Sequence, residues 1–111
     1  MTHAQFLPDP VVAAFTEGLE HDLGSRLKEV WLFGSRARRE AREDSDYDFL
    51  VVADCPRSVI SEATVAESCA VFDRYGAFIG PVNYDSSLWE RAKKSSLGRT
   101  ILAEGVKVYE R

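Results

Sequence analysis

Cysteine is scarce in this chain of 111 residues, which holds only 2 cysteines. Two cysteines cannot build the disulfide framework of a small secreted protein, so they favour a reducing compartment. Long hydrophobic runs are missing too, since none approaches the roughly 20 residues that a membrane-spanning helix requires. The N-terminus lacks the basic and apolar segments of a signal peptide. The sequence therefore predicts a cytoplasmic protein without a membrane segment.

An excess of positive charge is also absent, because 14 Lys and Arg residues face 18 Asp and Glu residues, for a net charge of -4. A protein that coats nucleic acid draws its affinity from a basic surface, so this charge balance excludes that class. Any phosphate binding must be local. With 45% hydrophobic residues, a chain of this length can bury a core without disulfide or metal staples. We therefore expect a single domain over residues 1–111.

Hydrophobic periodicity and turn residues divide the chain into helices and strands. Asp9 and Pro10 are typical of a helix start, and the helix is predicted from apolar residues at every fourth position: Val11, Phe15, Leu19, Leu23 and Leu27. The further expected elements are a strand at 29–33, a short helix at 36–42, a strand at 46–53, a helix at 58–75, a strand at 77–84, short helices ending at residues 92 and 104, and a strand at 106–109. This order predicts an α/β or α+β fold.

Two of the expected strands carry a distinctive pattern. The strand at 46–53 begins polar and becomes continuously apolar, which is typical of a central strand covered on both faces. The strand at 77–84 contains Gly80 and Pro81. Because proline cannot donate a hydrogen bond within a sheet, this strand is expected at an edge or with a bulge.

A phosphate-binding turn is predicted directly after the first strand. Gly34 allows a ligand to approach the backbone closely, and Ser35 at a helix N-terminus offers its hydroxyl and free N–H groups to a phosphate. Arg36 and Arg38 add guanidinium groups, which suit bidentate contacts to phosphate oxygens. Arg39 is expected to face water.

Two aspartates are predicted at the start of the central strand. Asp46 and Asp48 are two residues apart, so their carboxylates point to the same face of the sheet. Two carboxylates suit Mg²⁺, which takes one or two of them together with substrate phosphates. With the phosphate-binding turn nearby, they predict a site for a nucleoside triphosphate and Mg²⁺.

The run GSRARREAREDSDYDFLV resembles the signature of the minimal nucleotidyltransferases of the DNA polymerase beta superfamily, which is Gly-Ser, ten residues and Asp-x-Asp. The closing segment ILAEGVKVYE is similar to the last helix and strand of these small domains. The resemblance implies a short mixed β-sheet backed by helices. It also implies transfer of a nucleoside monophosphate from a nucleoside triphosphate, with ATP favoured, to an acceptor hydroxyl. Gly34 and Ser35 would hold the triphosphate, while Asp46 and Asp48 would be catalytic and bind the metal.

A partner protein follows from the same resemblance, because larger relatives use an extra helical region to hold the acceptor and this chain has no room for one. The implied partner is a HEPN-type helical protein, as in toxin-antitoxin pairs where the small transferase modifies its partner. The expected edge strand also leaves a homodimer open.

The chain departs from the family pattern at two places. Active members carry a third carboxylate on the following strand, and the candidates for a third ligand here are Asn83 and Asp85. An amide cannot take a proton, and Asp85 would need a bulge at Gly80 to re-aim the strand end. Family members also often have glycine where Arg39 stands. The alternatives are therefore a catalytically degenerate domain that acts as a binding or regulatory module, and a protein that neutralises its partner by contact alone.

Overall fold

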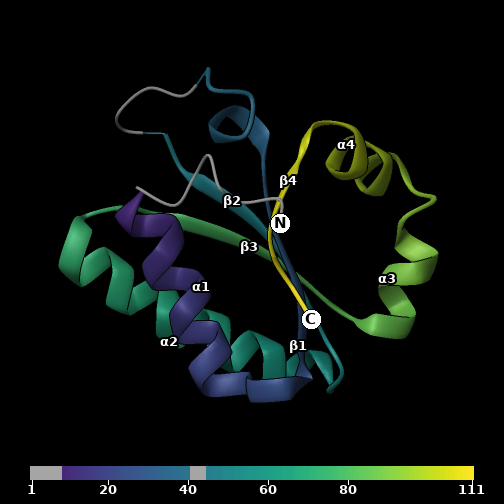
Figure 1. Ribbon diagram of the computed structural model, residues 1–111, viewed down its shortest axis with the longest axis horizontal. Coiled ribbons are helices and arrows are strands. Elements are labelled where there is room, and N and C mark those ends of the chain that lie inside the picture. The colour runs from purple at the N-terminus through teal and green to yellow at the C-terminus, as the bar shows by residue number, and fades with distance from the viewer. Residues whose placement is uncertain (1–8, 41–44) are drawn as a thin grey trace.

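Four strands form one mixed sheet in the order β3-β2-β1-β4 (Figure 1). The computed structural model describes residues 9–40 and 45–111. β1 runs antiparallel to both β2 and β4, whereas β2 and β3 are parallel and are connected through α2. The elements, in chain order, are α1 (Pro10–Leu23), β1 (Leu27–Phe33), β2 (Tyr47–Ala53), α2 (Arg57–Tyr75), β3 (Ile79–Asp85), α3 (Ser86–Ala92), α4 (Ser96–Glu104) and β4 (Val106–Glu110).

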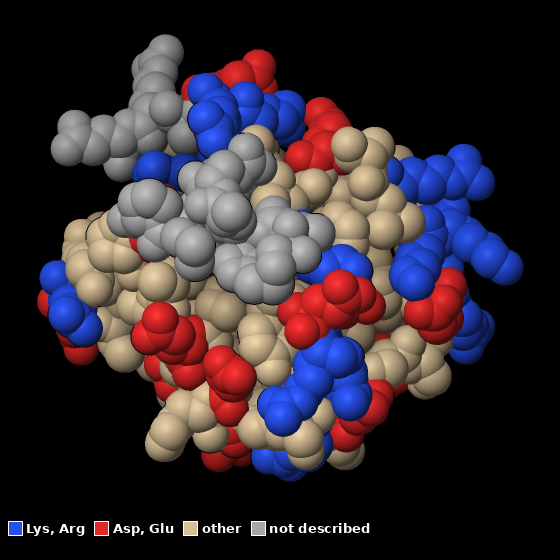
Figure 2. All heavy atoms as spheres, in the orientation of Figure 1, with Lys and Arg blue, Asp and Glu red and all other residues tan. Residues whose placement is uncertain are grey.

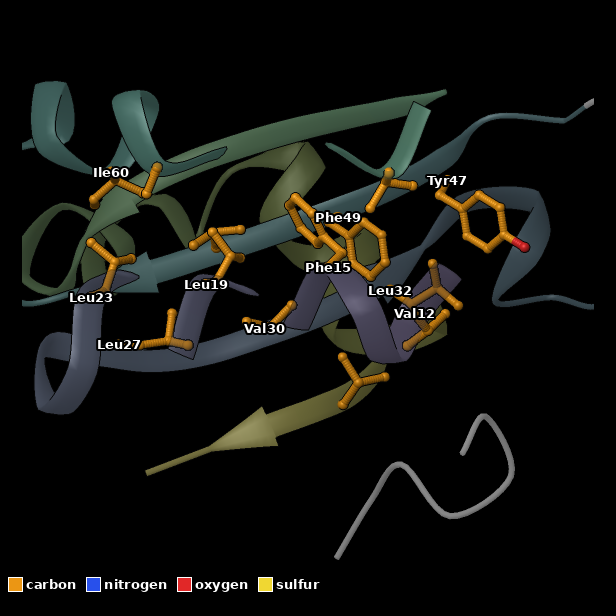
Figure 3. Packing of buried hydrophobic residues seen from close by; sticks show 14 of the residues in the cluster. Val12, Phe15, Leu19, Leu23, Leu27, Val30, Leu32, Tyr47, Phe49 and Ile60 are labelled. Carbon is orange, nitrogen blue, oxygen red and sulfur yellow. The ribbon is translucent and has the colours of Figure 1, made fainter. Parts of the chain in front are cut away.

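Two different pairs of helices cover the two faces of the sheet. α1 and α2 pack against one face, where Phe49 and Val51 of β2 join the larger core cluster. The rings of Phe15 and Phe49 meet there with centroids 4.6 Å apart (Figure 3). On the other face, Leu50 and other side chains pack beside α3 and α4 in a second cluster. The central strand is thus covered on both sides, which confirms its apolar pattern.

The start of α1 follows the sequence prediction. Asp9 is the N-cap residue, and its Oδ1 accepts hydrogen bonds from the backbone N–H groups of Val11 and Val12. The helix ends at Leu23, because Gly24 adopts a positive φ of 58°. Leu27, which continues the four-residue period in the sequence, is buried as the first residue of β1 instead.

The prediction of a short helix at 36–42 is wrong over the part of this segment that the structure describes. A single 3₁₀ turn at Gly34–Arg36 leads into further turns. Arg39 has a φ of 60°, which a right-handed helix does not allow. Residues 41 and 42 of the prediction lie outside the described ranges.

Strand β3 lies at an edge of the sheet, as Gly80 and Pro81 predict. It pairs with β2 in unbroken register from Ile79 to Asp85, so the alternative of a bulge does not apply. Across residues 9–40 and 45–111, no helix has the length and apolar character to cross a membrane.

Candidate functional site

Three adjacent strands bring the predicted motif residues together at one end of the sheet. β1 ends at Phe33, which is paired with Asp48 of β2, and Asp48 is paired with Gly80 of β3. Gly34 follows Phe33 and opens the 3₁₀ turn. Asp46 comes directly before β2, so the turn and both aspartates meet as the sequence predicts.

The side chain of Asp48 lies on the face of the sheet that α3 and α4 cover. Side chains alternate along a strand, and Leu50, two residues further on, belongs to the cluster beside these helices. Tyr47, by contrast, joins the core under α1. Asp48 is partly buried and Asp46 is exposed, which places the two carboxylates at the border between the protein interior and water.

Two glycines flank the carboxylate of Asp48, one on each side. A Cβ atom at Gly34 would overlap Asp48 Oδ2, and a Cβ atom at Gly80 would lie 3.3 Å from Asp48 Oδ1. Gly34 also has a φ of 76°, a conformation that side chains disfavour. Each oxygen of Asp48 therefore faces a space that any other residue would begin to fill.

Electrostatics at Asp48 favour the arrival of a cation. Burial raises the pKa of the Asp48 carboxyl above its usual value, the charge of Asp46 raises it further, and Arg38 partly opposes both. A carboxylate that is destabilised by desolvation and by a like charge is stabilised when a positive ion binds between them. The two oxygen donors and the open space beside them fit a hard divalent cation such as Mg²⁺.

The described residues alone supply an incomplete set of metal ligands. Across residues 9–40 and 45–111, no three His, Cys, Asp or Glu side chains gather closely enough to hold a metal ion. Mg²⁺ is commonly bound by one or two carboxylates, with phosphate and water oxygens completing the shell. Asp46 and Asp48 therefore fit an ion that arrives together with a nucleotide.

Arg36 turns inward toward the protein. Its Nε and Nη2 atoms donate hydrogen bonds to the backbone carbonyl of Ser45, at 3.2 and 2.6 Å. Its guanidinium carbon lies 4.0 Å from the centroid of the Tyr47 ring. These contacts tie the 3₁₀ turn to the chain on both sides of Asp46. The sequence analysis missed this positioning role, because it depends on a neighbour nine residues away.

Arg38, like Arg39, is an exposed cation of the turn. It forms ion pairs with Glu40 and with Glu104, the latter at 3.9 Å between Nη1 and Oε1. Since Glu104 is the last residue of α4, this helix borders the site. The influence of Arg38 on the pKa of Asp48 shows that its charge reaches the aspartate.

The turn that contains Ser35 is closed by backbone hydrogen bonds. The carbonyl of Gly34 accepts from the N–H of Arg38 at 3.2 Å, and the carbonyl of Ser35 accepts from the N–H of Glu40 at 3.0 Å. Ser35 itself is partly buried. It lies in the same turn as Gly34, the glycine that stands beside Asp48 Oδ2.

Tyr47 is a further residue of the site that sequence reasoning did not single out. Its hydroxyl donates a hydrogen bond of 3.0 Å to Oδ2 of Asp9, the N-cap of α1. Burial, aided by the charge of Asp9, raises the pKa of Tyr47 to about 12. With Arg36 stacked on its ring, Tyr47 links α1, the turn and β2. The signal in the sequence is its place between the two aspartates.

Neither candidate for a third ligand lies beside the two aspartates. Asn83 is only 8% exposed and faces α2, where its Nδ2 donates to Thr64 Oγ1 at 3.0 Å and to Ser61 Oγ at 3.3 Å. It is therefore on the opposite face of the sheet from Asp48. The prediction fails because Asn83 and Gly80 are an odd number of residues apart in an unbroken strand.

Asp85 lies at the other end of the strand. It is paired with Ala53, five positions beyond Asp48 along β2 and thus roughly 16 Å away. Its Oδ1 caps α3 by accepting hydrogen bonds from Leu88 N at 2.9 Å and from Ser87 Oγ at 2.7 Å. These bonds lower the pKa of Asp85. The bulge that would have re-aimed this residue is not formed.

A group of basic residues gathers over α3 and α4 (Figure 2). It comprises Arg91, Lys93, Lys94 and Arg99, although Lys93 is paired with Glu90 at 2.8 Å. The sequence analysis recognised only the arginines of the turn, because these four residues are spread over two expected short helices and the segment between them. This surface covers the same face of the sheet that carries Asp48.

Known proteins with the same sequence pattern are nucleotidyltransferases. The family described as the nucleotidyltransferase domain matches residues 14–108 of this chain. A proposed protein adenylyltransferase of Methanocaldococcus jannaschii is 28% identical over 102 residues, which cover 91% of this chain and 97% of that protein.

Solved structures with the same fold agree with this match. A toxin-antitoxin structure with AMP-PNP superposes with a TM-score of 0.60 at 17% identity, over 87% of this chain and 72% of that chain. A complex of a tri-AMPylated HEPN toxin from Shewanella oneidensis with its MNT antitoxin gives a TM-score of 0.54 at 15% identity, over 91% and 73% of the two chains. The sequence match and the shared α+β architecture lead to one conclusion: this chain belongs to the nucleotidyltransferase domain family.

Proposed function

We propose that this protein transfers AMP from Mg²⁺-bound ATP to a hydroxyl group of a HEPN-type partner protein. The observation that carries the proposal is the position of Asp48, whose two carboxylate oxygens face Gly34 and Gly80 on either side. Asp46 and the 3₁₀ turn lie next to it. Two carboxylates beside a glycine turn suit the phosphates of a nucleotide and the cation that accompanies them.

The descriptions of the similar proteins favour ATP as the nucleotide and a protein as the acceptor. The relative from Methanocaldococcus jannaschii is described as a proposed protein adenylyltransferase. One similar structure contains AMP-PNP, and another contains a HEPN toxin that carries AMP groups. A transferase of this kind would act on a partner in the cytoplasm, where Cys55 and Cys69 would remain reduced.

Each residue of the site has a separate task in this proposal. Asp46 and Asp48 would hold Mg²⁺, which when bound supplies charge neutralisation at the phosphates. The backbone at Gly34 and Ser35 would receive the triphosphate, and Arg38 would add positive charge from the turn. Arg36 would keep its structural contacts and hold the turn in place.

The reaction joins the acceptor oxygen to the nucleotide. The hydroxyl oxygen forms a bond to the α-phosphorus of ATP. The bond between that phosphorus and the oxygen that bridges to the β-phosphate breaks, and pyrophosphate leaves with the electron pair. The hydroxyl proton passes to water. Catalysis of this type depends chiefly on positioning and on charge stabilisation, which this site provides on rigid strands.

A second function is favoured by the composition of β3. The residues of this strand on the same face as Asp48 are Gly80, Val82 and Tyr84, and none of them carries a carboxylate. A site with two carboxylates suits a domain that binds Mg²⁺ and ATP but transfers nothing. Such a domain would act as a nucleotide-dependent binding module.

The two functions are separated by measuring binding and transfer in the same samples. We expect calorimetry to show Mg²⁺-dependent ATP binding that is lost in the double variant Asp46→Asn, Asp48→Asn. Asp54→Asn is a matched control, because this exposed residue follows the other end of β2 and should leave binding unchanged. Absence of binding in the native chain would contradict both functions.

Transfer is then measured with α-labelled ATP and a HEPN-type protein encoded beside this chain. Label that moves to the partner, and is lost with Asp48→Asn, supports the transferase. ATP binding without label transfer would instead support the binding module.

A further inference from the structure

Gly80 keeps one side of Asp48 accessible from outside the sheet. Its position directly opposite Asp48 follows from the parallel register, and a Cβ atom here would come within 3.3 Å of Asp48 Oδ1. Because β3 is the edge strand, none of the described residues forms a strand beyond Gly80. The Oδ1 side of Asp48 can therefore be approached across the edge of the sheet.

The rest of β3 is closed on this face. Val82 and Tyr84 pack against the cluster that contains Leu50 and Trp89, with the rings of Tyr84 and Trp89 5.7 Å apart. Side chains thus fill this face of the strand beyond Gly80. The opening is restricted to the end of β3 that lies next to Asp48.

Exposed aromatic residues lie at the same end of β3. Phe78, two residues before Gly80, is 61% exposed, and its carbonyl accepts a hydrogen bond of 2.9 Å from the N–H of Tyr47. Its ring lies 4.8 Å from that of Phe72, which is 45% exposed, and both rings line a cavity of about 250 Å³. An exposed pair of large apolar side chains is typical of a surface that contacts another protein.

The two sides of Asp48 are therefore unlike. Oδ2 faces Gly34 and the turn that suits a triphosphate, whereas Oδ1 faces Gly80 on the edge strand. The exposed aromatic pair lies at the same end of that strand, on the side of α2. A transfer reaction needs two substrates to meet at one phosphorus from opposite directions. The geometry matches this need, with one substrate on each side of a single carboxylate.

We propose that Gly80 is a specificity-determining residue of this site: it leaves the Oδ1 side of Asp48 open for the hydroxyl oxygen of the acceptor, which the partner protein delivers across the β3 edge beside Phe78. The inference rests on the proposed function and deepens it. In the transfer reaction described above, this oxygen is the atom that attacks the α-phosphorus. The nucleotide occupies the Gly34 side and does not need the space at Gly80.

Substitution at residue 80 distinguishes an effect on ATP binding from an effect on the acceptor protein. Gly80 lies in extended β3, a backbone conformation that other residues adopt, so Gly80→Ala and Gly80→Val are compatible with the fold. We expect both variants to weaken Mg²⁺-dependent ATP binding much less than they weaken transfer, because Asp46 and the Oδ2 side of Asp48 still face the turn that would hold the triphosphate. Gly80→Val should lower kcat/KM for AMP transfer to the HEPN-type protein by at least about 100-fold, and Gly80→Ala by less.

Matched variants at neighbouring positions serve as controls. Pro81→Val changes the next residue, whose side chain points to the other face, and should leave transfer within about threefold. Phe78→Ala should raise KM for the partner about tenfold with little change in kcat, whereas Val65→Ala, at another exposed apolar residue, should not.

A third substitution probes the same space without any partner. Gly80→Asp places a carboxylate opposite Asp48, and we expect it to tighten the binding of Mn²⁺ alone at least about tenfold, as measured by electron paramagnetic resonance. Pro81→Asp should have no such effect.

Three results would overturn the inference: equal transfer by Gly80→Val and the native chain, a loss of ATP binding in Gly80→Val as large as the loss of transfer, or no change in Mn²⁺ affinity in Gly80→Asp. Failure of the native chain itself to bind ATP or to transfer AMP would instead contradict the proposed function.

Discussion

Both ends of the parallel strand pair β2 and β3 carry aspartates, but their surroundings shift the carboxyl pKa in opposite directions. At one end, burial and the charge of Asp46 raise the pKa of Asp48. At the other end, hydrogen bonds from Leu88 and Ser87 lower the pKa of Asp85. A carboxylate whose charge is already stabilised by hydrogen bonds contributes to structure, while one whose charge is destabilised is prepared for a cation.

The largest expected effect comes from removing the charge at the destabilised end. Asp48→Asn should reduce AMP transfer by at least about 100-fold, because it removes a proposed cation ligand at the reacting centre. The same change should slightly raise Tm in the absence of Mg²⁺, since it removes repulsion between Asp46 and Asp48. Transfer assays and thermal melts with and without Mg²⁺ test this. A fall in both activity and Tm would mean that Asp48 is structural, like Asp85.

The opposite result is expected at the stabilised end. Asp85→Ala removes the N-cap of α3 and should lower Tm by a few degrees. Mg²⁺-dependent ATP binding should not change, because Asp85 lies at the far end of β3 from Asp48. Thermal melts and calorimetry on the same sample check both parts. Weakened ATP binding would show that the two ends are coupled.

A second carboxyl pair, formed by Asp22 of α1 and Glu67 of α2, extends the comparison to pH. The hydrogen bond to Asp22, together with burial, raises the pKa of Glu67 to about 7 from its usual 4.5, while His21 opposes the shift. The protonated form is therefore favoured in the folded state, so stability is greatest below the unfolded pKa and falls as pH rises through 7.

For this half-exposed pair we expect a loss of about 1 kcal/mol between pH 5 and 8, after solvent screening. Denaturant unfolding across this pH range measures the effect, and Glu67→Gln should flatten the profile. An identical slope in the variant would assign the pH dependence to other groups.

The smallest expected effect is a change in stability at Arg39, in the turn that follows β1. Arg39 has a φ of 60°, where side chains are strained and glycine is not. Arg39→Gly should stabilise the protein by about 0.5–1 kcal/mol, reduced by the added freedom of glycine in the unfolded chain. Denaturant unfolding gives the value, and ATP binding should remain unchanged. A destabilised variant would mean that the contacts of the Arg39 side chain outweigh the strain.

Much of the architecture follows from local signals. Asp9 and Pro10 start α1 because an N-cap carboxylate and a proline satisfy the first turn of a helix without help from distant residues. The apolar run of β2 identifies a strand buried on both faces, since only such a strand tolerates side chains of one kind on both sides. The spacing from Gly34 to Asp48 places the turn and the aspartates on neighbouring strands.

Other features depend on contacts between distant segments. Arg36 and Arg38 look alike in the sequence, but Arg36 binds the carbonyl of Ser45 and stacks on Tyr47, while Arg38 reaches Glu104 on α4. No local pattern contains this difference, because it arises only when the chain after the turn folds back along β1.

The sequence by itself determined the main helices and strands, the family and the motif from Gly34 to Asp48, but not the turn that stands where a short helix was expected. Only the tertiary structure decided what stands beside Asp48 on β3. Asn83 is one of the two candidates on that strand, yet the register turns it toward α2 and places Gly80 against the carboxylate. The packing of α2 and the pairing of β3 with β2 set the register of β3 and the face to which each of its side chains points. A shift of one residue would move every side chain of the strand to the opposite face of the sheet.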